Sequence, residues 1–407
     1  MQMITRFSLY GFLKNLNFSE PFLILFYLSI GLNFLQIGVL VSFQNICVNL
    51  MEIPSGALAD IYGRKSSMIF SLSSYIAAFI IFSLAGSFPP LFAAVFFFSI
   101  GEAFRTGTHK AMIFDWLRQN DRMKEKTKVY GFTRSWSKYG SAVSVIISTV
   151  IILLSQNYRW IFIFSIIPYV AGVWNLACYP DYLNSRQKQK MSIKEIFLHT
   201  FGSIRKTFTD IRIRKLIVQS MGFEGVFDVT KGYLQPVLQA QALMLALLFT
   251  LPEKESTAVV VGIVYFILHI ISAGASKRAH VFQEKFDSDK KAIRFMILFG
   301  FILTFVSSAG IYLKFFAAAI IAYILYYLIQ NLWRPILVAQ YDDLAENTEQ
   351  ATILSIESQA KTIGITVLAP VAGYLADNYG IDSAMIIFSG ILLMLWIYSL
   401  EKSRAAA

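Results

Sequence analysis

The sequence predicts an all-α integral membrane protein with twelve transmembrane helices in two six-helix bundles. The composition, the number of long apolar stretches and the placement of basic residues support this prediction. Of the 407 residues, 56% are hydrophobic and 15% are charged, and the mean hydropathy is +0.57. Soluble domains carry about a quarter charged residues. The excess of apolar residues therefore favours a membrane protein over a soluble one.

Twelve stretches are each apolar over about 20 residues, the length that spans the hydrocarbon core of a bilayer. The opening sequence MQMITRFSLY lacks a small-residue cleavage site, so we expect the first stretch to remain as a membrane helix. The predicted spans are 10–30, 35–58, 67–86, 89–116, 129–154, 159–178, 216–247, 257–275, 292–312, 315–340, 351–376 and 381–400.

Lys and Arg residues are distributed unevenly between the connections. The even-numbered connections carry 22 of them and the odd-numbered ones carry three, namely Arg159, Lys254 and Lys314. The positive-inside rule then predicts cytoplasmic N- and C-termini in a cell (inner) membrane. The same distribution explains the net charge of +11 through topology and anionic lipid contact, so nucleic acid binding is not expected.

The connection 179–215 is the one long polar segment, and it separates six spans from six. It predicts an N-terminal bundle at 1–178, a cytoplasmic linker and a C-terminal bundle at 216–407. Within it, SIKEIFLHTFGSIRKTF places apolar residues at helical spacing. This pattern indicates a surface-lying amphipathic helix, with a flexible linker as the alternative.

No pattern of catalytic or metal-binding residues is visible. The two cysteines, Cys47 and Cys178, both lie in apolar segments and form no metal-type spacing with histidine. There is no phosphate-binding glycine loop and no supported Ser/His/Asp set. We therefore expect no enzyme activity, no cofactor and no metal site.

The stretch MEIPSGALADIYGRKSSMI places two glycines, an acid and two bases between two apolar spans. Glycines allow helices to approach closely and turn sharply. The acid can accept hydrogen bonds from a helix N-terminus, while the bases can stay at the lipid headgroups. A purely topological role for the bases is the alternative. The residues are Gly56, Asp60, Gly63, Arg64 and Lys65.

GALADIYGRK resembles the signature loop of the major facilitator superfamily, which reads Gly, three residues, Asp, two residues and Gly-Arg-Lys or Gly-Arg-Arg. The resemblance implies a rocker-switch transporter in which Asp60 and Arg64 hold the inner ends of helices 2, 4 and 11 together. It also implies that helices 1, 4, 7 and 10 line a central cavity.

The segments EIPSGALAD and GEAFRTGTHKAMIFDWL resemble a bacterial subset of that family, which includes drug and metabolite exporters. Arg105 followed by Gly107 is similar to a second family motif linked to proton coupling. Three stretches depart from the family pattern. The connection between spans 8 and 9 keeps only Gly274 and a basic pair. GYLADNYG lies at the outer end of helix 11, where Gly373 is expected to allow close packing. Helix 5 lacks the Gly-Pro motif common in exporters.

Ionisable residues within apolar spans cost several kcal/mol each and usually face an aqueous cavity. A carboxylate that gains and loses an Arg neighbour as the bundles rock can bind and release a proton. We assign proton coupling to Glu20, Arg105, Glu224 and Asp228. Spacing places Arg105 with His109 on one face of helix 4, and Arg134 with Lys138 on one face of helix 5.

Further candidates would line the substrate cavity as charged, hydrogen-bonding or stacking groups. Glu357 and Lys361 are four residues apart and are expected to pair, either as a structural ion pair or with a substrate role. His269 stands alone and is expected to be a packing residue. The substrate-cavity candidates are Glu102, His109, Lys231, Arg334, Tyr27, Tyr233 and Trp333.

The expected function is proton-coupled efflux of small organic molecules by alternating access. Uptake or exchange of an anionic or zwitterionic metabolite is the alternative, which Arg105, Lys231 and Arg334 would favour. A transport-dead receptor on the same fold is disfavoured because the charged residues are retained. The expected partners are a small-molecule substrate, protons and the lipid bilayer, and a monomer is expected.

Overall fold

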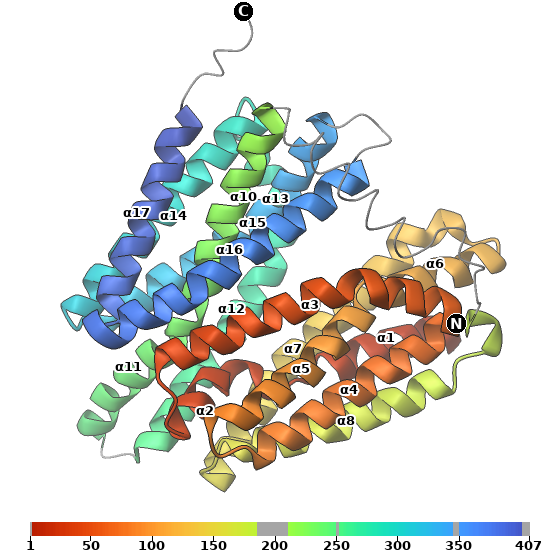
Figure 1. The fold of residues 1–407 in the computed structure, drawn as a ribbon, viewed down its shortest axis with the longest axis horizontal. Helices are drawn as coiled ribbons and strands as arrows, with labels where there is room; N and C mark the ends of the chain where they lie inside the picture. The colour runs from red at the N-terminus through yellow and green to blue at the C-terminus, as the bar shows by residue number, and fades with distance from the viewer. Residues whose placement is uncertain (1, 185–210, 250–251, 345–349, 401–407) are drawn as a thin grey trace, which may run out of the picture. The chain divides into compact units, whose positions relative to one another are not determined.

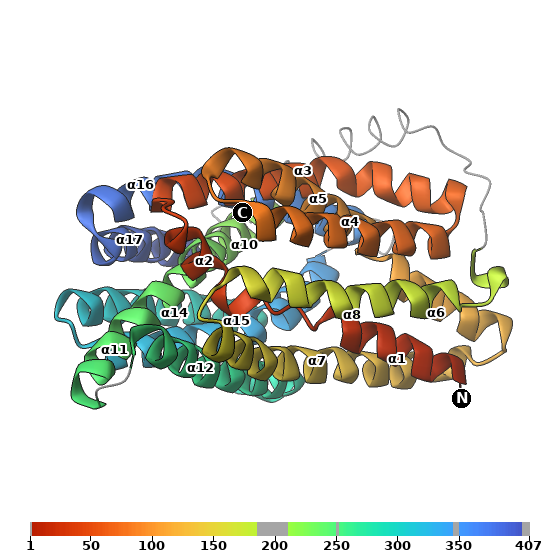
Figure 2. The ribbon, with the colours of Figure 1, turned by 90° about the horizontal axis from the view of Figure 1, so that it is seen from below.

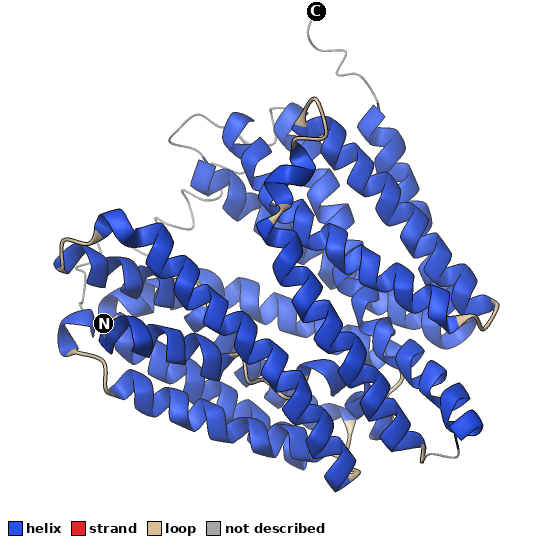
Figure 3. Ribbon diagram, turned by 180° about the vertical axis from the view of Figure 1, so that it is seen from behind, coloured by secondary structure: helices blue, strands red, loops and turns tan. Residues whose placement is uncertain are grey.

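A computed structural model describes the whole chain except residues 1, 185–210, 250–251, 345–349 and 401–407. The described part consists of helices joined by short connections and contains no strand (Figure 3). The amphipathic helix expected in the central connection lies outside the described residues. The expectation of an all-α protein is confirmed for the part that is described.

Nine segments of the described chain are long and apolar enough to cross a membrane. Each coincides with a span predicted from the sequence. They lie within the helices α3 (Phe34–Tyr62), α4 (Arg64–Leu84), α5 (Phe88–Arg105) with α6 (Thr108–Gln119), α7 (Lys126–Ser155), α8 (Arg159–Ala177), α12 (Glu253–Lys277), α14 (Asp289–Tyr312), α15 (Phe316–Leu344) and α17 (Ile381–Leu400) (Figure 1).

The other three expected spans fall on helical stretches that are interrupted or rich in polar residues. The first is divided into α1 (Gln2–Lys14), a 3-10 turn at Glu20–Phe22 and α2 (Leu23–Ser29). The seventh is divided by a 3-10 turn at Lys231–Tyr233, and the eleventh carries charged residues. The described helices therefore support a multi-span protein without fixing the count at twelve. The seventh span contains α10 (Ile211–Thr230) and α11 (Leu234–Phe249), and the eleventh contains α16 (Gln350–Tyr379).

Contacts divide the chain into two compact units. The first comprises Met1–Leu32, Phe43–Ile193 and Pro252–His269, and the second comprises the remainder. In the first unit, α1 lies beside α7 and α8 (Figure 2). This division assigns the start of α3 and most of α12 differently from the expected bundles at 1–178 and 216–407, which remain a prediction.

Close helix packing in the second unit joins the start of α3 to α16. The carboxylate of Asp377 accepts hydrogen bonds from the backbone N–H groups of Phe34 and Leu35, both at 2.8 Å. A Cβ on Gly373 would lie 2.2 Å from the carbonyl oxygen of Phe34, and one on Gly38 would lie 2.3 Å from that of Ala369. Glycine is therefore required at both positions, as expected for Gly373.

Candidate functional site

The turn between α3 and α4 contains the basic end of the glycine-rich motif. Gly63 has φ +96°, a left-handed conformation that favours glycine. Arg64 forms an ion pair with Asp115 of α6. Lys65 donates to the carboxylate of Asp181 at 2.9 Å and to the carbonyl of Tyr179 at 2.7 Å. Both bases therefore bind protein partners within the first unit, in addition to any contact that they make with lipid headgroups.

The other two motif residues lie near the end of α3. Gly56 has nothing within 4 Å of the position that a Cβ would occupy, so no close helix approach requires glycine there. This differs from the expected use of Gly56 in packing. Asp60 lies in α3, but its side chain is outside the described part of the chain. Its role as a gate residue therefore stays a prediction.

The fourth predicted span, 89–116, which we call helix 4 and which is distinct from α4, is interrupted between α5 and α6. Arg105 is the last residue of α5, Thr106 adopts an extended conformation, and Gly107 has φ +78°. Glycine adopts this φ with little strain, and the break follows from it. The spacing of Arg105 and His109 predicted that they share one face of a continuous helix, and the break between α5 and α6 shows that they do not. They nevertheless line the same cavity.

A half-buried ion pair lies at the end of α5. Arg105 pairs with Glu102, whose other carboxylate oxygen accepts a hydrogen bond from the hydroxyl of Tyr75 in α4. The Tyr75 ring also explains Gly101, because a Cβ there would lie 2.7 Å from it. Glu102 is thus held between two helices and neutralises Arg105. It does not line the cavity into which Arg105 reaches.

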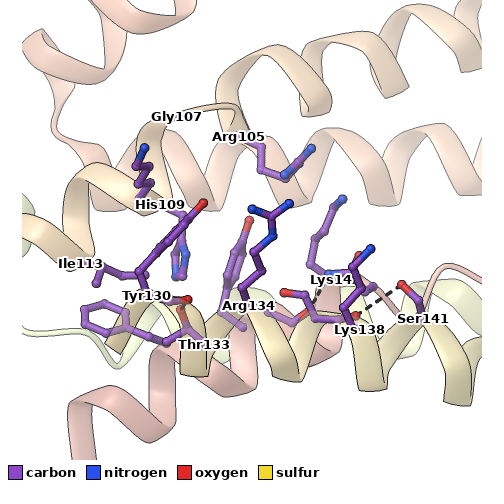
Figure 4. A pocket seen from close by; sticks show the side chains of 16 residues that line it. Lys14, Arg105, Gly107, His109, Ile113, Tyr130, Thr133, Arg134, Lys138 and Ser141 are labelled. Carbon is purple, nitrogen blue, oxygen red and sulfur yellow. Dashed lines mark hydrogen bonds between the residues drawn. The ribbon is translucent and has the colours of Figure 1, made fainter. Parts of the chain in front are cut away.

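A cavity of about 390 Å³ lies in the first unit between α1, α7 and the break in helix 4. Figure 4 shows the charged ends of Lys14, Arg105, Arg134 and Lys138 turned toward one space. No carboxylate is present among the described lining residues. We call this the cationic cavity; its lining residues are Phe7, Tyr10, Gly11, Lys14, Asn15, Arg105, Gly107, His109, Lys110, Ile113, Tyr130, Thr133, Arg134, Ser137, Lys138 and Ser141.

A second group of charges lies between α10, α15 and α16 of the second unit. Glu224 is 2% exposed; it accepts hydrogen bonds from Lys361 at 2.8 Å and from the indole of Trp333 at 3.1 Å. Arg334 reaches Glu357 at 2.8 Å and Glu224 at 3.4 Å. We call this the paired cluster; it consists of Glu224, Asp228, Lys231, Arg334, Glu357 and Lys361.

The paired cluster replaces the expected contact between Glu357 and Lys361. Glu357 is fully buried and binds Arg334 and the hydroxyl of Ser220, which donates at 2.5 Å. Lys361 instead binds Glu224 and lies 3.6 Å from Asp228. The direct pairing was therefore predicted wrongly, because side chains on neighbouring helices are better placed than the one four residues along α16.

The remaining assignments divide between the paired cluster, packing sites and the first helix. Lys231 pairs with Asp228 at 2.6 Å. Glu20 is exposed in the 3-10 turn before α2, and its charge acts on Lys14 and Lys138. The three aromatic candidates are buried in ring contacts and none lines the cationic cavity. These are Tyr27 against Phe26 and Phe82, Tyr233 against Phe34, and Trp333 stacked on Phe223.

Sequence reasoning missed several side chains of the cationic cavity. Arg134 and Lys138 were placed on one face of helix 5, but without a role. Lys14 and Tyr10 were not identified, although they are four residues apart on α1 and share a face. A lysine within the first apolar span was the available signal. Asp115, the partner of Arg64, is not among the candidate residues either.

Comparison with known proteins identifies the fold. Residues 3–356 match the model of the Major Facilitator Superfamily. The chain is 20% identical over 385 residues to YxaM, an uncharacterized MFS-type transporter of Bacillus subtilis (strain 168), covering 92% of this chain and 89% of that one.

Solved structures of similar fold include the nucleoside transporter NupG, with a TM-score of 0.77, 15% identity and 98% of each chain covered. They also include a D-xylose-proton symporter, with a TM-score of 0.72, 13% identity, and coverage of 98% of this chain and 97% of that one. The human organic anion transporter MFSD10 is a third, with a TM-score of 0.62, 14% identity, and coverage of 97% of this chain and 98% of that one. At these identities the likeness shows the fold alone. Together with the family match, it shows that the chain belongs to the Major Facilitator Superfamily of membrane transporters.

Proposed function

We propose that the chain is a proton-coupled secondary transporter of the cell (inner) membrane, which exports small organic molecules as an antiporter and acts as a monomer by alternating access. Membrane transport follows from the family. Proton coupling is supported by one observation, the paired cluster. Export is proposed because the segments around Pro54 and Arg105 resemble those of bacterial exporters.

The paired cluster has the composition that a proton-binding switch needs. Three carboxylates are matched by three cations, so the cluster is neutral while every acid is ionised. Protonation of Glu224 would remove the charge that holds Lys361 and Arg334, and a net positive charge would then remain. In a low-dielectric interior such an imbalance costs several kcal/mol. Proton binding is therefore expected to rearrange α15 and α16 relative to α10.

The proposal is tested with the purified protein in proteoliposomes under an imposed pH gradient. A panel of small organic anions, zwitterions and lipophilic cations is offered from outside. An antiporter accumulates its substrate in vesicles that are acidic inside, because protons leave as substrate enters. Glu224→Gln should abolish gradient-driven accumulation while substrate exchange without a gradient persists. Glu284→Gln, an exposed acid outside the spans, is the matched control and should retain accumulation.

Two results would contradict parts of the proposal. Accumulation only in vesicles that are alkaline inside would indicate symport and therefore uptake. Equal transport with and without a pH gradient would exclude proton coupling altogether. The absence of any flux for any compound, together with ligand binding, would favour a receptor on the transporter fold.

A second candidate function is uptake or exchange of an anionic or zwitterionic metabolite. The cationic cavity favours this candidate, because a lipophilic cation entering it would meet Lys14, Arg134 and Lys138 with no carboxylate among the lining residues. The proteoliposome panel separates the two, since both the sign of the gradient and the charge of the substrate are varied.

A further inference from the structure

We propose that the cationic cavity binds a small organic molecule with at least two negative charges, held between α1, α7 and the start of α6. The proposal rests on the proposed function, in that it names the substrate class of that transporter. It is carried by the surplus of positive charge in the cavity, by buried polar atoms that lack partners there, and by the uncapped helix end.

The surplus charge is large and concentrated on one side of the cavity. Among the described residues, Lys14, Arg134 and Lys138 form no ion pair, whereas Arg105 is neutralised by Glu102. Their charged ends converge in Figure 4. The charge of Glu20 acts on Lys14 and Lys138, and this single carboxylate can offset at most one of the three positive charges. At least two positive charges therefore remain without a matching anion, so the ligand is expected to be a dianion.

Three buried polar atoms at the same cavity have no hydrogen-bond partner within the described part of the chain. They are the hydroxyl of Tyr10, Nε of Arg105 and Nε2 of His109. A buried polar group without a partner costs about 1–3 kcal/mol. Each of these residues lines the cavity, so a ligand with acceptor oxygens would supply partners to Tyr10 and Arg105.

The start of α6 adds a further feature that favours an anion. Gly107 is its N-cap residue and provides no side-chain cap. Gly107 and His109 both line the cavity, so the first turn of this 12-residue helix borders it. Free N–H groups at a helix N-terminus attract negative charge. The positive φ of Gly107 creates this helix end in the middle of an apolar span.

The apolar side of the cavity limits the ligand to a compact organic molecule. The centroid of the His109 ring lies 4.0 Å from that of the Tyr10 ring, with 30° between the planes, and 5.6 Å from that of the nearly perpendicular Phe7 ring. Ile113 lines the same side. A volume of about 390 Å³ falls at the lower end of the range of small-molecule sites. An aromatic ring with two acidic groups meets both requirements.

The test measures binding to the full chain in detergent without added phospholipid. Isothermal calorimetry and thermal melting compare two dianions, isophthalate and phenyl phosphate, with benzoate and benzylammonium. The dianions should bind at least about tenfold more tightly than benzoate, and benzylammonium should not bind. Because no gradient is present, binding can succeed where proton-coupled transport fails, and the two proposals are tested separately.

Variants place the binding at this cavity. Arg134→Met and Lys138→Met should each weaken dianion binding at least about tenfold. Lys128→Met, an exposed base on the same helix α7 outside the cavity, should leave it unchanged. Tyr10→Phe should weaken binding while the melting temperature of the ligand-free protein stays equal or rises, because an unpartnered buried hydroxyl is removed.

Three outcomes would overturn the proposal. One is dianion binding that is unchanged in Arg134→Met and Lys138→Met. Another is equal binding of benzoate or benzylammonium. The third is stabilisation of the protein by phosphatidylglycerol micelles alone, lost in the same two variants, which would identify a lipid headgroup as the anion in place of a soluble substrate.

Discussion

The cationic cavity and the paired cluster both place several charges within apolar helices, but they compensate those charges differently. In the paired cluster every cation contacts a carboxylate at 3.6 Å or less, and the two glutamates are almost fully buried. In the cationic cavity three cations lack such contacts among the described residues, and three buried polar atoms at its wall have no partner.

This difference indicates different roles. A neutral, fully paired group is stable by itself and responds to anything that changes its charge, such as a proton. A group with surplus charge and unpartnered atoms is incomplete and is stabilised by a ligand of opposite charge. Removal of one cation should therefore have opposite effects on the stability of the ligand-free protein: a loss where the cation is paired, as in the paired cluster, and no loss where it lacks a carboxylate partner, as for Lys138 in the cationic cavity.

The largest effect is expected for Glu224→Gln in the paired cluster. This change leaves Lys361 and Arg334 with one carboxylate fewer, and breaking a buried pair costs about 3–5 kcal/mol. The double variant Glu224→Gln/Lys361→Gln restores the charge balance and should recover at least half of that loss. Melting temperature and denaturant unfolding in detergent provide the measurement; losses that simply add would show that the cluster is not electrostatically coupled.

A smaller loss is expected for Arg105→Gln at the edge of the cationic cavity. Glu102 would keep the hydrogen bond from the Tyr75 hydroxyl but lose its ion pair with Arg105, which should lower the free energy of unfolding by about 1.5–3 kcal/mol. Coupled transport should be lost as well, whereas Lys124→Gln, at an exposed base in the connection before α7, should retain it. Full gradient-driven transport by Arg105→Gln would remove this residue from the coupling mechanism.

Gly107→Ala tests whether the break in helix 4 shapes the cavity. Nothing lies within 4 Å of the added Cβ, so only the left-handed backbone opposes the change, at about 1–2 kcal/mol. Thermal melting should show this loss, together with weaker dianion binding. Gly131→Ala, in α7 and also with open space around it, is the control for a glycine without positive φ and should be neutral or stabilising.

The smallest effect is expected for Lys138→Met on the ligand-free protein. Removal of one of several like charges should change the free energy of unfolding by no more than about 0.5 kcal/mol, in the stabilising direction. The same measurement on Lys361→Met should show clear destabilisation. Equal losses in both variants would refute the contrast between an incomplete site and a completed one.

The sequence predicts the helical spans and names all six charged members of the paired cluster as candidates, because long apolar stretches and charges within them are evident without coordinates. The partners of those charges could not be predicted in the same way. Glu357 and Lys361 have the spacing of a helical pair, but their contacts come from α10 and α15. Contacts between helices depend on rotation and crossing angle, which helical periodicity does not determine.

The cationic cavity was harder to predict for a local reason. A single glycine in an apolar helix is usually tolerated, so nothing in the pattern marks Gly107 as the place where helix 4 breaks. Lys14 lies close to the end of a predicted span, where a lysine can extend to the interface. Only the fold shows that α1 stops there and that Lys14 faces the same space as Arg134.

The carboxylate of Asp377 accepts hydrogen bonds from the first N–H groups of α3, and this contact can form only late in synthesis. The acceptor lies 343 residues after Phe34, whose N–H it binds. At about 5–20 residues per second, a ribosome needs roughly 20 to 70 s to reach it. During that interval the backbone N–H groups at the start of α3 lack the acceptor that Asp377 provides in the complete fold. Truncation before Asp377 should therefore yield a nascent chain whose early part is inserted but not yet resistant to protease.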